Sequence, residues 1–494
     1  MLTAVNDWIN GVVWGPIGLC LLGAAGVWFT VYTGGFQLRY AGHWLRCTVG
    51  ALFADGEVRA RPEQDGHGIS QFQSVCTSLA ATIGTGSIVG VASAIAAGGP
   101  GAVFWMWAMA LLGTMTAYAE RVLGICYRRK DSRGAWVGGA MYYLRDGLGR
   151  LPGCRRLGQA LAALFSLFCA LACFGIGNIA QVNSIAGSMT AAFGVPAHTT
   201  GLVLTVVTGL VVAGGLQRVA AVTERLVPFV AVVYLAGAAV VIAVNIRQLP
   251  AALEAILRGA FGLRAAGGGL VGYGARQAVV WGLKRGAFSN EAGLGSAVAV
   301  ACSAHVTEPV QQGMWGIFEV CVDTLVVCTV TALVILTSGV VDLQTGAVCG
   351  TAGEAALVGQ AFGSVFGGFG PKFIALAILL FAYSTVLGWC CSGTTAFGYL
   401  FGQRLKWLYR EAFVLLTYSS ATMPLRLAWQ LCDTLNGLMM LPNLVGVLAL
   451  SGTVKAVTRN YLARVLDGAD LPPLRSALRW PDATGPGAKD AVFW

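Results

Sequence analysis

The sequence is poor in charge, because only 11% of its 494 residues are Asp, Glu, Lys or Arg. Soluble globular domains carry about 25% charged residues, so this deficit argues against a soluble domain. Hydrophobic residues make up 56% of the chain. Backbone groups in lipid must be paired within a helix or a closed barrel, and a helix needs about 20 mostly apolar residues to cross. The apolar runs lack the short alternating strands of a barrel. We therefore predict an all-α polytopic membrane protein.

Histidine is also scarce, and its four residues are scattered in or near predicted loops, where they form neither a metal cluster nor a triad. The 14 Cys residues lie mostly inside apolar segments without metal-type spacing, so we interpret them as small packing residues. The glycine-rich stretches lack the preceding strand and the GK[ST] of a phosphate loop. We therefore expect no enzyme and no cofactor. The N-terminus has no basic region followed by a cleavage site, so we expect no cleaved signal peptide.

Apolar segments suited to membrane helices recur along the chain, and we count eleven of them, the tenth being the shortest. They cover residues 11–33, 70–97, 101–127, 160–191, 199–216, 224–245, 275–302, 312–338, 373–400, 411–423 and 425–451. Between the first two, we expect an amphipathic stretch and a polar loop.

The net charge of +10 comes from Lys and Arg in a few loops, which argues against nucleic-acid binding. The loop 128–159 alone holds Lys130 and seven Arg residues. Positive charge accumulates on the cytoplasmic side of membrane proteins. We therefore predict a protein of the plasma (inner) membrane with its N-terminus outside and its C-terminus in the cytoplasm.

Glycine clusters interrupt two of the apolar segments. The second segment contains ATIGTGSIVG (81–90), and the seventh contains FSNEAGLGSA (288–297). These segments open two consecutive five-helix halves, which would enter the membrane in opposite directions. Gly-interrupted helices at matching positions of inverted halves indicate a transporter binding site. The alternative is that the glycines only allow close helix packing, but Asn290 and Glu291 beside the second cluster favour a site.

Ionisable residues within apolar segments are functional candidates, because burying a charge in lipid is costly. Glu291 would either contact a ligand or cap a broken half-helix. Glu319 and Asp323, four residues apart, would share one helix face. No cationic partner for them is evident in the sequence, which suggests a water-lined or packed polar role.

Broken helices expose N–H groups at one half-helix end, which favour a carboxylate, and C=O groups at the other, which favour a cation. A zwitterionic amino acid with a sodium ion fits these two ends, since sodium prefers oxygen ligands. Ser384 and Thr385 offer hydroxyls, although such hydroxyls often bond their own helix. Gln181 would contact substrate or bond between helices, and Trp389 would wall a small pocket or pack.

Several stretches resemble the alanine or glycine:cation symporter family, also called sodium:alanine symporters. They are FQSVCTSLAATIGTGSIVGVASAIAAGGPGAVFWMW (72–107), GGAMYYL (138–144), GNIAQVNSIAG (177–187), KRGAFSNEAGLGSA (284–297), EPVQQGMWGIFEVCVDTLVVCTVTALVILTSG (308–339), YSTVLGW (383–389) and LCDTLNGLMMLPNLVGVLALSG (431–452). Integral-membrane enzymes, channels and amino-acid sensors are the competing classes.

The resemblance implies a leucine-transporter-type fold with about 11 transmembrane helices, two inverted five-helix repeats and two broken helices. The repeats would cover residues 70–245 and 246–452, the latter with an outer loop at 246–274. An N-terminal helix and linker (1–69) would precede them, and a cytoplasmic tail (453–494) would follow. The implied function is import of alanine, glycine or similarly small amino acids, coupled to Na⁺ or H⁺. The expected partners are the substrate, the ion and the bilayer, without nucleic acid or an obligate protein partner.

The resemblance also implies site residues. The substrate-binding residues would be Thr85, Gly86, Gln181, Phe288, Asn290, Glu291 and Trp389. The sodium site would combine carbonyls near Ala80 and Ile83 with the hydroxyls of Ser384 and Thr385.

The sequence departs from the family pattern at three places. Ser87 stands where the family has Asn in GTGN, which removes an amide and leaves any cation contact there in question. Ala140 replaces the Pro of GGPMYY, and 390–394 lacks the aromatic and acidic residues that follow GW in the family.

Overall fold

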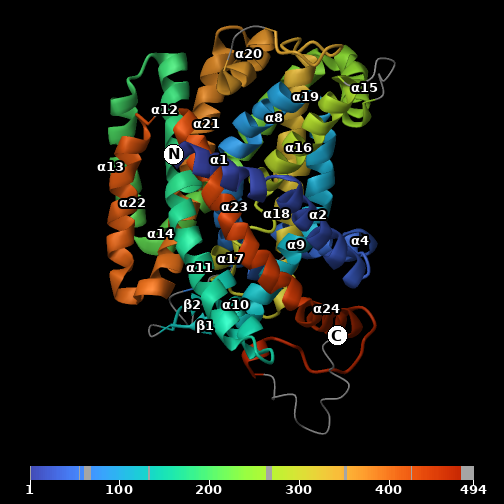
Figure 1. The fold of residues 1–494 in the computed structure, drawn as a ribbon, viewed down its shortest axis with the longest axis vertical. Coiled ribbons are helices and arrows are strands. Elements are labelled where there is room, and N and C mark those ends of the chain that lie inside the picture. The colour runs from blue at the N-terminus through green and yellow to red at the C-terminus, as the bar shows by residue number, and fades with distance from the viewer. Residues whose placement is uncertain are drawn as a thin grey trace.

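The structure is a computed structural model that describes residues 2–54, 56–59, 68–131, 134–262, 270–349, 353–423 and 425–479. In these residues the chain forms a bundle of tilted helices, with one hairpin of two short strands, β1 (Arg129–Lys130) and β2 (Trp136–Val137) (Figure 1). Much of the polar loop expected before residue 70, part of the outer loop expected at 246–274 and the end of the predicted tail lie outside the described residues.

The helices have the following bounds in chain order. They are α1 (Leu2–Val13), α2 (Pro16–Tyr32), α3 (Phe36–Arg39), α4 (Ala41–Leu45), α5 (Ala51–Ala54), α6 (Gly56–Arg59), α7 (Gln71–Thr82), α8 (Val91–Gly98), α9 (Ala102–Tyr127), α10 (Ala140–Asp146), α11 (Arg155–Phe174), α12 (Ala180–Phe193), α13 (Ala197–Val212), α14 (Gly215–Val244), α15 (Leu249–Phe261), α16 (Leu270–Asn290), α17 (Val298–Ala301), α18 (Pro309–Val320), α19 (Thr329–Thr337), α20 (Glu354–Phe366), α21 (Phe369–Phe401), α22 (Lys406–Ser420), α23 (Leu425–Ala449) and α24 (Ser451–Val465).

Wider π-helical turns separate some of these α-helices from the next. They lie at Arg46–Gly50, Gly86–Gly90, Gly175–Ile179 and Cys321–Cys328. Such turns occur often at functional sites, because the extra residue redirects backbone groups and side chains.

Seven stretches of the described chain are long and apolar enough to cross a membrane, and a bent pair makes an eighth. The seven are Trp8–Tyr32, Ala102–Tyr127, Arg155–Phe193, Gly215–Val244, Pro309–Thr337, Phe369–Phe401 and Cys432–Ala449, and the bent pair is Gln71–Thr82 with Gly86–Gly98. The chain is therefore a multi-pass helical membrane protein with a broken helix, as predicted.

The three other predicted segments also contain helices, namely α13, α16 and α22. Of these, α13 is apolar but shorter, and the other two are not among the stretches that meet the length and hydropathy of a span. The number of eleven crossings thus stays a prediction.

Two central helices organise the packing around the broken span. Helix α9 packs against α16 and α18, whereas α21 packs against α11, α12 and α20. The first half of the broken span, α7, packs on α14 and α21, and its second half, α8, packs on α16. The hairpin, α10 and α24 lie at one end of the bundle, and α15 and α20 lie at the other (Figure 1).

Candidate functional site

The first helix break follows α7, which starts with a capping box. The Ser70 hydroxyl accepts from the Gln73 amide, and the Gln73 side chain accepts from the Ser70 amide. Helix α7 ends at Thr82, and the chain bends by 48° before α8. A Cβ at Gly84 would lie 2.4 Å from the Thr385 hydroxyl oxygen. The glycine therefore allows α21 to approach the unwound backbone, as the predicted break requires.

The second break follows α16, at the second glycine cluster. Glu291 has a φ of 56°, the only positive φ among the described non-glycine residues, and Gly293 and Gly295 continue with φ of 89° and 74°. A left-handed conformation at a non-glycine residue is uncommon and marks a backbone that its surroundings hold in place. The Asn290 side-chain oxygen accepts from the Ala292 amide at 3.0 Å. Helix α16 therefore ends at the second glycine cluster, and the next helix, α17, begins only at Val298.

Trp389 on α21 connects the two breaks. Its indole nitrogen lies 3.2 Å from the Ala81 carbonyl oxygen and 3.0 Å from the Glu291 carboxylate. The other carboxylate oxygen of Glu291 accepts from the Ser296 hydroxyl at 2.5 Å. Glu291 and Trp389, both buried, thus contact each other, and Glu291 also bonds Ser296 within its own break.

Gln181 lies against the first break. The Thr85 amide donates to the Gln181 side-chain oxygen at 3.2 Å, and the Gln181 amide group donates to the Ile176 carbonyl in the preceding π turn. The Thr85 hydroxyl is buried and has no hydrogen-bond partner among the described residues. Buried hydroxyls rarely stay unpaired, so this one indicates a group that the protein alone does not supply.

The remaining predicted substrate residues divide into two groups. Phe288 is buried beside Gly86, where an added Cβ would lie 3.5 Å from its ring. The side chain of Asn290 instead bonds to other protein groups. Its amide group donates to the Thr324 hydroxyl at 3.2 Å, and its oxygen accepts from the Ala292 amide.

Three of the four residues predicted for sodium converge. The Thr385 hydroxyl oxygen lies 2.8 Å from the Ala80 carbonyl oxygen and 3.5 Å from that of Ile83. Ser384, in contrast, donates to the Phe381 carbonyl of its own helix at 2.7 Å. A bond to its own helix was the alternative to a sodium ligand that the sequence left open for this hydroxyl. Carbonyl and hydroxyl oxygens are the ligands that a hard cation prefers.

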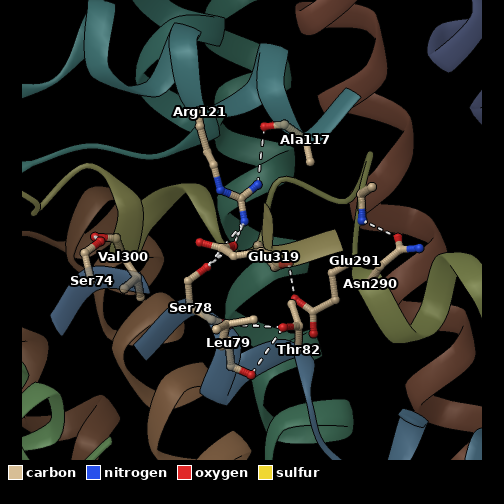
Figure 2. Close-up of polar contacts among 12 residues, drawn as sticks. Ser74, Ser78, Leu79, Thr82, Ala117, Arg121, Asn290, Glu291, Val300 and Glu319 are labelled. Carbon is tan, nitrogen blue, oxygen red and sulfur yellow. Dashed lines mark hydrogen bonds and ion pairs between the residues drawn. The ribbon is translucent and has the colours of Figure 1, made fainter. Parts of the chain in front are cut away.

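Glu319 has a cationic partner, which was not evident in the sequence. Arg121 on α9 forms an ion pair with Glu319 inside the bundle, and the Ser78 hydroxyl on α7 donates to the same carboxylate at 2.6 Å (Figure 2). The sequence places Arg121 at the end of another apolar segment, so their meeting depends on helix packing that local spacing does not specify. The triad links α9, α18 and the broken span.

Asp323, in the π turn that follows α18, contacts the first broken span just after its break. Its carboxylate accepts from Ser87 at 2.5 Å and from Ser289 at 2.7 Å, so residues beside both breaks meet on it. Glu319 and Asp323 therefore both face the first broken span, as their predicted shared face requires. Sequence reasoning missed Ser289, whose position beside the second glycine cluster was the available signal.

Glu120 is a further buried carboxylate near the second break, and it is hydrogen-bonded to other protein groups. It accepts from the Gly295 amide at 3.1 Å and from the Asn443 amide group at 2.5 Å. These bonds fix the break against α9 and α23.

The part of the chain that the structure describes contains no group of three or more His, Cys, Asp or Glu placed to hold a metal ion. All 14 cysteines are free, and eight of them are buried, as packing residues would be, whereas Cys20 and Cys349 are exposed.

A cavity of about 310 Å³ opens next to the hairpin. It is lined by Trp136, Ala299, Val300, Cys390, Cys391 and Arg410, among others. Cys390 directly follows Trp389 in the sequence, but Trp389 itself does not line the cavity.

Comparison with known proteins gives a consistent result. The sequence model of the family described as "Sodium:alanine symporter family" matches residues 1–473. The chain is 42% identical to the sodium/alanine symporter AgcS of Methanococcus maripaludis, covering 92% of this chain and 96% of that one. It is 33% identical to a putative sodium/proton-dependent alanine carrier protein of Bacillus subtilis, covering 98% and 96%.

The fold is also similar to a solved structure. A manganese transporter from Eremococcus coleocola matches with a TM-score of 0.50 and 14% identity, covering 80% of this chain and 79% of that chain. At this identity the likeness concerns the fold alone.

Proposed function

This chain belongs to the sodium:alanine symporter family, a family of transporters and not of enzymes, and on that premise we propose that it imports alanine, glycine or a similarly small amino acid together with Na⁺ or H⁺. The observation that carries this proposal is the buried, unpaired Thr85 hydroxyl at the first break. It lies at the break of the first span, and the half-helix ends of broken helices are where transporters bind anionic substrate groups.

The substrate would lie between the two breaks and α21. Thr85 and Gly86 would receive its carboxylate and amine, with Gln181, Asn290 and Glu291 completing the polar surroundings. Phe288 and Trp389, both buried, would limit the side-chain volume. A pocket walled by two rigid aromatic rings discriminates by size, because a larger side chain would have to displace packed atoms.

The coupling ion would occupy a site on the opposite side of the first break. The carbonyl oxygens of Ala80 and Ile83 and the hydroxyl of Thr385 supply ligands there, and Ser384 would have to turn from its own helix to join them. Ion and substrate bound to the same broken helix would raise each other's affinity through a coupling free energy.

The proposed architecture has eleven transmembrane helices of the leucine-transporter type, with inverted repeats at residues 70–245 and 246–452. The location of one glycine-rich break near the start of each repeat supports it. The hairpin, α10 and α24 share one end of the bundle and carry the basic residues Arg129, Lys130, Arg145, Lys455, Arg459 and Arg464, which supports a cytoplasmic position for that end (Figure 1).

The cavity next to the hairpin would then be part of the cytoplasmic exit. Residues of the hairpin and of α21 line it, together with Arg410 and Lys406. Cationic side chains there would attract the carboxylate of a departing amino acid. Alternating access would open this path while the opposite side closes.

The proposal is tested by uptake of labelled alanine into proteoliposomes. An inward sodium or proton gradient should accelerate uptake and drive alanine above its external concentration, and an ionophore that collapses the gradient should abolish this accumulation. Uptake that never exceeds equilibration would indicate a channel, and binding without flux would indicate a sensor.

A further inference from the structure

Helix α14 is the least buried of the seven spanning stretches. The protein buries 28% of its most apolar window, against 44–72% in the other six. The helix begins at the hairpin end of the bundle, because Gly215 lines the same cavity as Trp136. Further along, exposed side chains such as Val232 and Val244 cover its outer side. This side of α14 therefore faces the bilayer.

Two arginines stand on this outer side near the start of the helix. Arg218 and Arg225 are both exposed, and no charged residue follows Arg225 in α14. Seven residues make about two helical turns, so the two side chains share a face and their Cα atoms lie about 10 Å apart along the axis. They belong to an open groove of about 670 Å³. Its lining consists of Arg218, Ala221, Val222, Arg225, Leu226 and Phe229.

The acidic residue next to Arg225 does not neutralise this groove. Glu224 accepts from the side-chain amide of Gln73 on α7 at 2.9 Å, on the inner side of the helix. Among the described residues, neither arginine takes part in an ion pair. Arg218 donates to the Leu210 carbonyl at 2.8 Å, near the end of α13. A guanidinium has five N–H donors, so this bond leaves most of them for a group outside the protein.

The groove combines phosphate-binding groups at its start with hydrocarbon further along. A guanidinium forms paired hydrogen bonds with phosphate oxygens, and a long cationic side chain near a helix end extends to the headgroup level. Val222, Leu226 and the Phe229 ring, which is 61% exposed, would lie beside acyl chains. Any phospholipid could satisfy the apolar contacts, but two uncompensated cations select one with a net negative charge.

We propose that Arg218 and Arg225 bind the phosphate of an anionic phospholipid from the cytoplasmic leaflet, with its acyl chains along Val222, Leu226 and Phe229. Anionic lipids give that leaflet its negative surface potential, and basic pockets on the cytoplasmic side of membrane proteins bind their headgroups. The site goes beyond the proposed function, whereas its effect on transport rests on that function.

The inner side of the same two turns explains how this lipid would affect transport. The hydroxyl oxygens of Thr223 and Thr77 are 2.8 Å apart, and Gln73 bonds Glu224, so both contacts join α14 to the first half of the broken span. A lipid bound on the outer side would hold the start of α14 at the membrane surface. Helix α7 would then move against a fixed support, so transport should be faster in anionic membranes.

Native mass spectrometry of the purified full chain, titrated with phosphatidylglycerol or with phosphatidylcholine of the same acyl chains, tests the site. The wild type should bind phosphatidylglycerol more tightly. Combining Arg218→Gln with Arg225→Gln should weaken that binding about 30-fold. Arg247→Gln is the matched control and should bind as the wild type does, because this exposed arginine lies just beyond the other end of α14.

Three results of this titration would overturn the inference. The first is equal affinity of the wild type for the two lipids, and the second is undiminished binding of phosphatidylglycerol by the double variant. The third is displacement of the lipid by glycerol 3-phosphate, which would assign the arginines to a soluble phosphate ester. A lipid-free dimer that dissociates in the double variant would show that a second copy covers this face, and would also overturn it.

Alanine uptake supplies the second test, in vesicles of phosphatidylcholine with or without phosphatidylglycerol. Uptake by the wild type and by Arg247→Gln should rise several-fold with phosphatidylglycerol, whereas the double variant should be equally slow in both membranes. Melting temperatures in detergent should agree among the three proteins, because the replaced side chains are exposed. A wild type that ignores the lipid, or a double variant that responds as fully, would contradict the effect on transport.

The lipid site and the proposed function fail in distinguishable ways. Lipid binding in the mass spectrometer requires no substrate, so it decides the site even if the protein transports no alanine. Uptake that responds to sodium or protons without any preference for anionic lipid would leave the proposed function intact and remove only the lipid site.

Discussion

The Trp389 indole nitrogen donates a hydrogen bond to the Glu291 carboxylate at 3.0 Å, which joins helix α21 to the break that follows α16. The same nitrogen lies 3.2 Å from the Ala81 carbonyl oxygen beside the other break. One indole ring therefore bridges both interrupted helices. Gly177, where a Cβ would lie 2.4 Å from the Trp389 Cβ, gives the ring the room to pack there.

Replacing Trp389 should change which amino acids are accepted. Trp389→Ala removes the wall of the proposed pocket, so we expect uptake of leucine or methionine to rise relative to alanine. Competition of labelled alanine uptake by a panel of amino acids measures this. Truncating a buried Trp also costs about 3–5 kcal/mol of stability, so expression and melting temperature must be recorded alongside.

Trp389→Phe is the control for size. It keeps most of the ring volume but loses the bond to Glu291, so selectivity for small side chains should persist while the uptake rate falls. An unchanged substrate panel in Trp389→Ala would show that the ring does not wall the pocket.

Replacing Thr85 separates binding from stability. The Thr85 hydroxyl has no partner among the described residues, so Thr85→Val should leave the melting temperature of the substrate-free protein unchanged or higher. Alanine affinity should fall about 10- to 100-fold, because a hydrogen bond to a charged group contributes about 1.5–3 kcal/mol. Isothermal titration calorimetry and thermal melts measure the two effects.

Thr85→Ser keeps the hydroxyl and should retain most of the affinity. If Thr85→Val binds alanine as tightly as the wild type does, the hydroxyl does not face the substrate.

Thr385 is the residue expected to link sodium to α21. Thr385→Val preserves shape but removes the oxygen beside Ala80, so the sodium concentration for half-maximal uptake should rise about tenfold or more. Thr385→Ser should stay near the wild type. A sodium dependence that is the same in all three proteins would exclude this hydroxyl from the ion site.

Cysteine labelling tests the proposed exit and the orientation together. Cys391 lines the cavity next to the hairpin, whereas Cys349 is exposed in the loop between α19 and α20. A membrane-impermeant maleimide should modify Cys391 only from the cytoplasmic face and Cys349 only from the outer face. Cys391→Ser and Cys349→Ser identify each signal in right-side-out and inside-out vesicles.

Excess alanine should slow modification of Cys391 if the cavity leads to the substrate. The same labelling of Cys391 from both faces would contradict a closed path, and reversed labelling of the two thiols would invert the predicted topology.

The broken helices were predictable because their signal is local. Glycines at 84 and 86 and at 293 and 295 lie where the backbone leaves the helix, and Glu291 stands among them. Composition and apolar length were likewise sufficient for the multi-pass helical architecture.

Contacts between distant segments were not predictable in the same way. Arg121 and Glu319 are 198 residues apart, and Ser87 and Asp323 are 236 apart, so no spacing rule connects them. The π turn at Cys321–Cys328 also shifts the residues that follow Glu319 relative to an α-helical register. The Ser384 hydroxyl bonds its own helix in the structure. The sequence allows either this bond or a sodium ligand and does not decide between them.

The central claim is that a small amino acid and sodium bind together at the broken helices. Calorimetric titration of the purified protein with alanine, at a series of sodium concentrations with choline as the replacement, tests it most directly. The account predicts that the Kd for alanine falls as sodium rises, and that alanine lowers the Kd for sodium by the same factor. A Kd for alanine that is identical in sodium and in choline would contradict sodium coupling at this site.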